Sequence, residues 1–142
     1  MSTWLQSEAE RAFGQAARER RRARAICQLR RRGCDCCEQL PVADAVANPR
    51  AARHGVRAIP LEQITCTLEP NRAAHFDPRF RPAAAVRERW QRVWLAEARG
   101  AVLPPISVVP AESGYAVRDG HHRVSVALAR GAVTIDAVVS RG

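Results

Sequence analysis

The segment 114–131, which reads GYAVRDGHHRVSVALARG, constrains the fold most strongly, because it predicts a strand, a tight turn and a helix in succession. Residues 115–117 form a short apolar run typical of a strand, and residues 119–120 have the Asp-Gly chemistry of a turn. From His121 onward the apolar side chains recur at helical spacing. Gly131 follows the last residue of this spacing, where helices commonly end with a glycine in the left-handed backbone conformation. The segment therefore predicts a helix whose N-terminus directly follows a strand.

The N-terminus of this helix is a candidate anion site. The backbone N–H groups of residues 120–123 have no intrahelical partner there, and they lie at the positive end of the helix dipole. A cation in the first turn opposes that dipole, so Arg123 makes sense if a phosphate binds between them. His121 and His122 add donors that titrate near neutral pH. We expect Gly120, His121, His122 and Arg123 to bind phosphate; a helix start with solvated polar side chains is the alternative.

The other patterns complete a small α+β domain with a mixed sheet. The predicted order is β–α–β–β–α–β, with a strand at 56–59, a helix at 83–99, a hairpin of strands at 103–109 and 115–118, and a closing strand at 133–140. The stretch 60–64 predicts a turn of helix, residues 65–77 a loop, and Asp77-Pro78 a helix start. In the long helix, the residues expected to pack onto the sheet are Val86, Trp90, Val93 and Trp94, with Glu88 paired to Arg92 outside.

Two regions are expected along the chain: a helical extension and linker at 1–55, and the domain at 56–142. Residues 3–32 lack Pro and are rich in Ala, Glu and Arg, which predicts a helix that ends at Gly33. A short helix is expected at 42–47, before Asn48-Pro49. The chain has 142 residues, which suits one domain of ordinary size.

Basic charge is concentrated in the N-terminal helix. The net charge is +9, and all 23 basic residues are arginine, a bias that also fits an arginine-rich proteome. Residues 1–32 hold nine arginines and three acidic residues. Such density favours a nucleic acid partner, DNA or RNA, with a solvated helix face as the alternative. The expected contact residues are Arg20, Arg21, Arg22, Arg24, Arg30, Arg31 and Arg32.

Cysteines and hydropathy bear on the compartment. The five cysteines are an odd number and are expected to be thiols, and Cys34-Asp-Cys36-Cys37 lacks the spacing of a structural zinc site, so no metal site is assigned. No apolar run approaches the ~20 residues of a membrane span, and the N-terminus lacks a signal-peptide core. We therefore expect a cytoplasmic protein without a membrane partner.

Residues 56–142 resemble the N-terminal domain of ParB proteins and the related sulfiredoxin fold. The matching pieces, in the family's order, are IPLEQI at 59–64, Asn71-Arg72, Phe76-Asp77, LPPISV at 103–108, YAVRDGHHR at 115–123, and Gly131. The block at 119–123 is similar to the Gly-Glu-Arg-Arg box of ParB and the Gly-Cys-His-Arg box of sulfiredoxin, which hold nucleotide phosphates. The same Asp-Gly-His-His-Arg block occurs in ParB-like free serine kinases.

The resemblance implies a nucleotide-binding protein. The nucleotide would be CTP, ATP or ADP with Mg²⁺, and Arg72 would join the phosphate-binding residues. Asp119 would approach the metal, and Glu69, with Glu62 as the other candidate, would act as the base if phosphotransfer or nucleotide hydrolysis occurs.

The sequence also departs from the family. His121 stands at the position of the sulfiredoxin nucleophile, so reductase chemistry is not expected. The DNA-binding and dimerisation domains of ParB would follow residue 142, so the activity of a complete ParB is not expected, and recognition of an amino acid by the additional lobe of the kinases is not expected either. A non-catalytic nucleic-acid-binding module that uses the arginine-rich helix is the alternative function.

Overall fold

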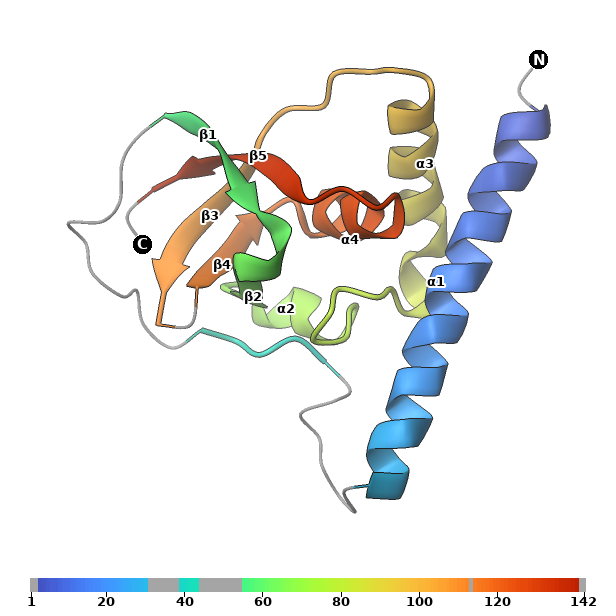
Figure 1. Ribbon diagram of the computed structural model, residues 1–142, viewed down its shortest axis with the longest axis horizontal. Helices are drawn as coiled ribbons and strands as arrows, with labels where there is room; N and C mark the ends of the chain where they lie inside the picture. Colours follow the sequence, from blue (N-terminus) through green and yellow to red (C-terminus); the bar gives the residue numbers. More distant parts are fainter. Residues whose placement is uncertain (1–2, 31–38, 44–54, 113, 141–142) are drawn as a thin grey trace.

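The computed structural model describes residues 3–30, 39–43, 55–112 and 114–140, and it has an α+β fold with a mixed five-stranded sheet (Figure 1). The helices are α1 (Thr3–Arg30), α2 (Pro70–Ala73), α3 (Arg87–Ala98) and α4 (His121–Ala129), and two short 3₁₀ turns are η3 (Leu61–Gln63) and η4 (Ala84–Val86). The strands are β1 (Val56–Pro60), β2 (Ile64–Thr67), β3 (Ile106–Ala111), β4 (Gly114–Asp119) and β5 (Thr134–Val139).

The sheet has the order β1-β5-β3-β4-β2. The β3–β4 hairpin and the β1–β5 pair are antiparallel, whereas β5 and β2 lie parallel to β3 and β4, respectively. The predicted hairpin and the predicted first and last strands are thus confirmed. The strand β4 leads directly into α4, so the predicted strand, turn and helix are confirmed as well.

Helix α3 packs mainly against α1 and α4 (Figure 1). The buried Trp90 ring meets Phe13 of α1 edge to face, with 5.5 Å between ring centroids, and its indole N–H donates to Ser125 Oγ of α4 at 2.8 Å. The prediction that this helix is amphipathic and buries Trp90 is confirmed, but its tryptophan lies between two helices rather than on the sheet. Trp94 is only partly buried, under the Arg130 guanidinium.

Helix α1 joins the core through its first half only. Its buried residues are Ala9, Phe13, Ala16 and Ala17, and no described residue after Ala17 in α1 is buried. The apolar stripe is thin, as the sequence indicates, but Phe13 gives it a firm anchor on α3. The division of the chain at residue 55 stays a prediction.

The expected loop at 65–77 instead contains a strand and a helical turn. Strand β2 extends to Thr67 and pairs with β4, and Pro70 begins α2. The β-branched residues of Ile64-Thr-Cys-Thr67 favour a strand, and the long-range pairing with β4 overrides the absence of a full apolar run. Proline suits the first position of a helix because its missing N–H would have no partner there.

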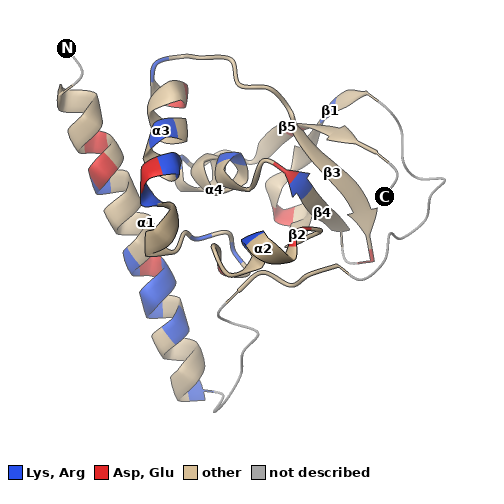
Figure 2. Ribbon diagram, turned by 180° about the vertical axis from the view of Figure 1, so that it is seen from behind, with Lys and Arg blue, Asp and Glu red and all other residues tan. Residues whose placement is uncertain are grey.

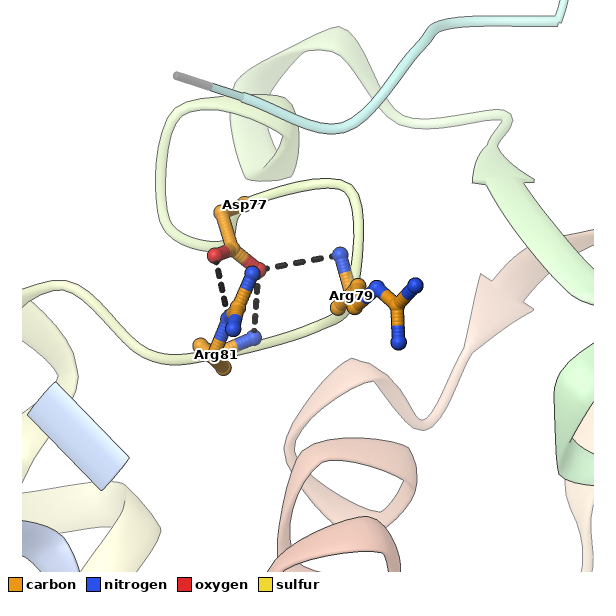
Figure 3. A network of polar contacts seen from close by, with 3 residues as sticks. All are labelled: Asp77, Arg79 and Arg81. Carbon is orange, nitrogen blue, oxygen red and sulfur yellow. Dashed lines mark hydrogen bonds and ion pairs between the residues drawn. The ribbon is translucent and has the colours of Figure 1, made fainter. Parts of the chain in front are cut away.

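The helix start predicted at Asp77-Pro78 is wrong. Asp77 is buried, and its carboxylate accepts the backbone N–H groups of Arg79 and Arg81 at 2.9 and 2.8 Å and the Arg81 Nε–H at 2.6 Å (Figure 3). An aspartate satisfies backbone donors equally well in a closed turn and at a helix cap, so the sequence signal is ambiguous. Pro82 follows Arg81 and disfavours helix there.

The short helix predicted at 42–47 does not begin at residue 42. Val42 instead forms a parallel bridge with Thr67, and residues 44–47 lie outside the described residues.

The cysteines differ in their chemical state. Cys66 is a free, buried thiol, but Cys27 is disulfide-bonded, which corrects the expectation that all five cysteines are thiols. The remaining cysteines, at 34, 36 and 37, lie outside the described residues.

Candidate functional site

A cleft with a volume of about 640 Å³ lies where α2, α3, the end of β4 and the start of α4 meet. Its lining includes the residues expected to bind phosphate and two of the expected carboxylates: Glu69, Arg72, Asp119, Gly120, His121, His122 and Arg123. Glu62, the other candidate base, lies outside this cleft and lines a separate pocket. The lining of the cleft also includes residues to which the sequence analysis gave no part in the site: Asn71, His75, Arg89, Val93, Leu103, Pro104 and Arg118. The fold therefore brings two separate sequence motifs, one after β2 and one after β4, to a single cleft.

The N-terminus of α4 opens into this cleft. The cap residue Gly120 has φ +114°, and no side chain caps the helix. The first intrahelical bond runs from Val124 N–H to Gly120 C=O. Because the N–H groups of the first turn have no such partner, they are available to an anion.

Gly120 is required by its neighbour as well as by its backbone angle. A Cβ atom placed there would lie 2.4 Å from Cγ2 of the buried Ile106. The glycine thus lets the start of α4 pack directly on β3.

His121 and His122 are buried in the wall of the cleft. His121 Nε2 lies 2.6 Å from Thr67 Oγ1, which also accepts the Glu69 backbone N–H at 2.9 Å. Phe76 stacks on the ring of His121 and meets that of His122 edge on. These contacts from β2 and the segment after α2 hold both rings in place.

The two histidines are neutral at pH 7, which differs from the expectation that they titrate near neutral pH. Burial, together with the positive charge of Arg72, lowers the pKa of His121 from 6.5 to about 4. Burial and the charges of Arg89 and Arg72 lower the pKa of His122 from 6.5 to about 4. Each ring can still donate one hydrogen bond, but neither supplies a positive charge.

Arg123 lines the cleft, but its guanidinium is engaged within the protein. It donates to the carbonyl oxygens of Pro104 and Pro105, and its Nη2 lies 3.1 Å from Asp119 Oδ2. The side chain is only 16% exposed. Arg123 therefore ties α4 to the segment that enters β3, and the two carbonyls together with the Asp119 carboxylate account for a cation in the first helical turn without a bound phosphate.

Arg72 and Arg89 are the arginines of the cleft whose charge is not engaged. Within the described residues, neither guanidinium makes a hydrogen bond or an ion pair. Arg118, the fourth arginine of the lining, donates to Ser140 Oγ at 3.1 Å. The sequence alone could not identify Arg89 as a residue of the cleft, because its place there depends on which face of α3 lies toward α2 and α4.

The two carboxylates of the lining differ in their surroundings. Asp119 is 78% exposed on its side chain and pairs with Arg123. Glu69 precedes α2, and its backbone is held by Thr67. Nowhere in the described ranges do three His, Cys, Asp or Glu side chains gather in a way that could hold a metal ion. A divalent cation would therefore need oxygen ligands from a bound phosphate in addition to these carboxylates.

The arginines of α1 are absent from the lining of the cleft. Arg21, Arg22, Arg24 and Arg30 are exposed, and Arg20 is half-buried. Arg31 and Arg32, which were also expected to contact nucleic acid, lie outside the described residues. No helix in the part of the chain that the structure describes is both long and apolar enough to cross a membrane.

Comparison with solved structures finds a likeness in structure to sulfiredoxin. A crystal structure of sulfiredoxin from Arabidopsis thaliana aligns with a TM-score of 0.44 and 20% sequence identity over 62% of this chain and 86% of that one. No protein-family model matches the chain, and a search of curated proteins finds no match. The α+β architecture stands on the strands and helices described above, and membership of the ParB or sulfiredoxin family stays a prediction from the sequence.

Proposed function

We propose that the cleft binds the phosphate groups of a nucleoside di- or triphosphate. The observation that carries the proposal is the pair of unengaged arginines, Arg72 and Arg89, which line the same cleft as the open N-terminus of α4. Guanidinium groups and free backbone N–H groups at a helix N-terminus are both donors that proteins use to bind phosphate.

The charge of the lining fits a polyphosphate. Four arginines and two carboxylates line the cleft, and the low pKa values of His121 and His122 leave those rings neutral at pH 7. The excess is positive, and it lies beside buried walls where electrostatic attraction is stronger than in water. The volume of about 640 Å³ also lies within the usual range for small-molecule sites.

Within this proposal the phosphate-binding residues have different roles. Arg72 and Arg89 contact the phosphate groups directly, together with the backbone of Gly120, His121 and His122. Arg123 is a positioning residue, because its bonds to the Pro104 and Pro105 carbonyls hold the start of α4 in place. The resemblance of residues 119–123 to the phosphate-binding boxes of ParB and sulfiredoxin supports the same site.

Mg²⁺ and phosphotransfer form the finer part of the proposal. The exposed Asp119 carboxylate is available to a Mg²⁺ ion that also binds the phosphate oxygens, and Glu69 is available as the base. Because phosphoryl transfer depends mostly on positioning and charge neutralisation, this set of groups is sufficient only if an acceptor binds beside Glu69.

The test is a titration calorimetry screen of CTP, ATP, ADP and GTP, each with and without Mg²⁺. The proposal expects at least one nucleotide to bind well below millimolar concentration, and the nucleoside without phosphates to bind far more weakly. Equal binding of nucleoside and nucleotide would show that the cleft recognises the base alone. If none of the four binds below millimolar concentration, the proposal is wrong.

A further inference from the structure

The second half of α1 carries dense positive charge, and none of its residues is buried within the part of the chain that the structure describes. Residues 18–30 include six arginines and one glutamate, and the last buried residue of α1 is Ala17. Figure 2 shows the basic residues of α1 concentrated toward its C-terminal end. At 1.5 Å per residue, these 13 helical residues extend over about 20 Å.

Three of these arginines form a cluster on the outer face of the helix. Arg18, Arg21 and Arg22 are spaced three and four residues apart, so they share one face, and all three are exposed. At about 100° per residue, Arg18 and Arg22 lie on the side of the helix away from Phe13, which points into the core, and Arg21 lies at the flank of that side. Within the described residues, none of the three makes a hydrogen bond or an ion pair.

The like-charge spacing of these three arginines disfavours the helix, and a bound anion would offset that cost. Like charges three or four residues apart destabilise a helix, and this half receives no compensating burial from the core. By contrast, Arg11 in the first half is paired with Glu8 at 3.1 Å.

We propose that the outer face of α1, through Arg18, Arg21 and Arg22, binds the phosphate backbone of double-stranded DNA. The positive charge of this face is complementary to the phosphates of DNA. The major groove of B-form DNA is wide enough to admit an α-helix, whereas the major groove of A-form RNA is too narrow for side chains to read. Guanidinium groups form bidentate contacts with phosphate. A lipid surface is a poorer match, because the face has charged residues in place of a continuous apolar stripe. This surface is separate from the cleft, so the inference does not depend on the proposed nucleotide site.

The test measures binding to a labelled 20-base-pair DNA duplex by fluorescence anisotropy at several salt concentrations. The variant Arg18→Gln/Arg21→Gln/Arg22→Gln keeps good helix formers in α1 and removes three charges. The matched control, Arg57→Gln/Arg92→Gln/Arg99→Gln, removes three charges from exposed arginines of β1 and of the region of α3, outside α1. Circular dichroism confirms that both variants keep the helix content of the unmodified protein.

The proposal expects the plot of log affinity against log salt to become less steep by about 2.7 in the α1 variant, because each lost phosphate contact contributes about 0.9. The control should change the slope far less. Equal changes of slope in the two variants would mean that net charge alone sets the affinity for DNA, which would overturn the proposal. Absence of DNA binding by the unmodified protein at about 50 mM salt would overturn it as well. Tighter binding to duplex RNA or to anionic vesicles than to DNA would also overturn it.

Discussion

Gly120 is the position where the fold and the candidate site depend most directly on one residue. Its φ of +114° lies in the left-handed region, where a side chain costs about 1–2 kcal/mol. A Cβ atom would also lie 2.4 Å from Ile106 Cγ2 and 2.7 Å from Ile106 Cβ, and Ile106 is buried. Overpacking of this kind adds about 1–3 kcal/mol. The stiffer unfolded chain of the alanine variant returns up to about 1 kcal/mol, so we expect Gly120→Ala to lower the free energy of unfolding by about 1–5 kcal/mol in total.

Gly131 provides the matched control. It also has a positive φ, of +82°, but no atom lies within 4 Å of the position that its Cβ would occupy. Gly131→Ala should therefore show the conformational cost alone, about 1–2 kcal/mol, less the gain of up to about 1 kcal/mol from a stiffer unfolded chain. Urea unfolding followed by circular dichroism measures both variants.

A double-mutant cycle isolates the contact itself. Ile106→Ala removes Cγ2, the nearer of the two atoms that the new Cβ meets, but keeps Cβ at 2.7 Å, so the double variant should recover part of the loss and be more stable than the sum of the single changes predicts. A Gly120→Ala variant that is no less stable than Gly131→Ala, with no coupling to Ile106, would refute the reasoning.

Two further predictions concern the core and the pH dependence. Trp90→Ala should lower the free energy of unfolding by about 3–5 kcal/mol, since the ring is fully buried and contacts both Phe13 and Ser125. The control Trp4→Ala changes a side chain that is 69% exposed and should alter the free energy of unfolding by no more than about 0.5 kcal/mol. Urea unfolding measures both variants, and equal losses would contradict the packing of α1 on α3. The folded-state pKa values of His121 and His122, about 4 against 6.5, mean that the unfolded chain binds more protons between these values, so stability should be complete above pH 6.5 and fall as the pH drops toward 4. His122→Asn should make the urea midpoint between pH 7 and pH 5 less dependent on pH, and an unchanged dependence would mean that His122 is not buried neutral.

Local sequence signals predicted the elements that depend on neighbouring residues. In 114–131 the strand, the glycine at positive φ, the helical spacing and the closing Gly131 all agree, and the structure forms the same elements in that order. The same holds for α3, whose buried Trp90 lies at helical spacing from its other apolar residues.

The elements that were missed depend on partners far along the chain. Strand β2 is an edge strand stabilised by its pairing with β4, some 50 residues later, as in Thr67 and Val117. Arg123 meets the carbonyls of Pro104 and Pro105, and no local pattern links them. Asp77 closes a turn instead of starting a helix because both structures satisfy the same backbone donors.

For the candidate site, the sequence predicted the motif but not the residues with unengaged charge. The residues at 119–123 are in the cleft as a group, because a strand that leads into a helix places them together. Arg89 comes from α3, and its approach to the cleft depends on how α3 packs against α1 and α4. The hydrogen bonds of Arg123 to the Pro104 and Pro105 carbonyls likewise depend on tertiary packing. Reasoning from the helix dipole alone therefore assigned Arg123 a direct contact with phosphate.

The most direct test of the phosphate site is calorimetry with the tightest-binding nucleotide on the double variant Arg72→Gln/Arg89→Gln. The control is Arg92→Gln/Arg99→Gln, which removes two exposed arginines outside the cleft. Each lost charge-assisted contact is worth about 1.5–3 kcal/mol, so the cleft variant should bind at least about 100-fold more weakly while the control binds as the unmodified protein does. Unchanged nucleotide affinity in the cleft variant would contradict the account.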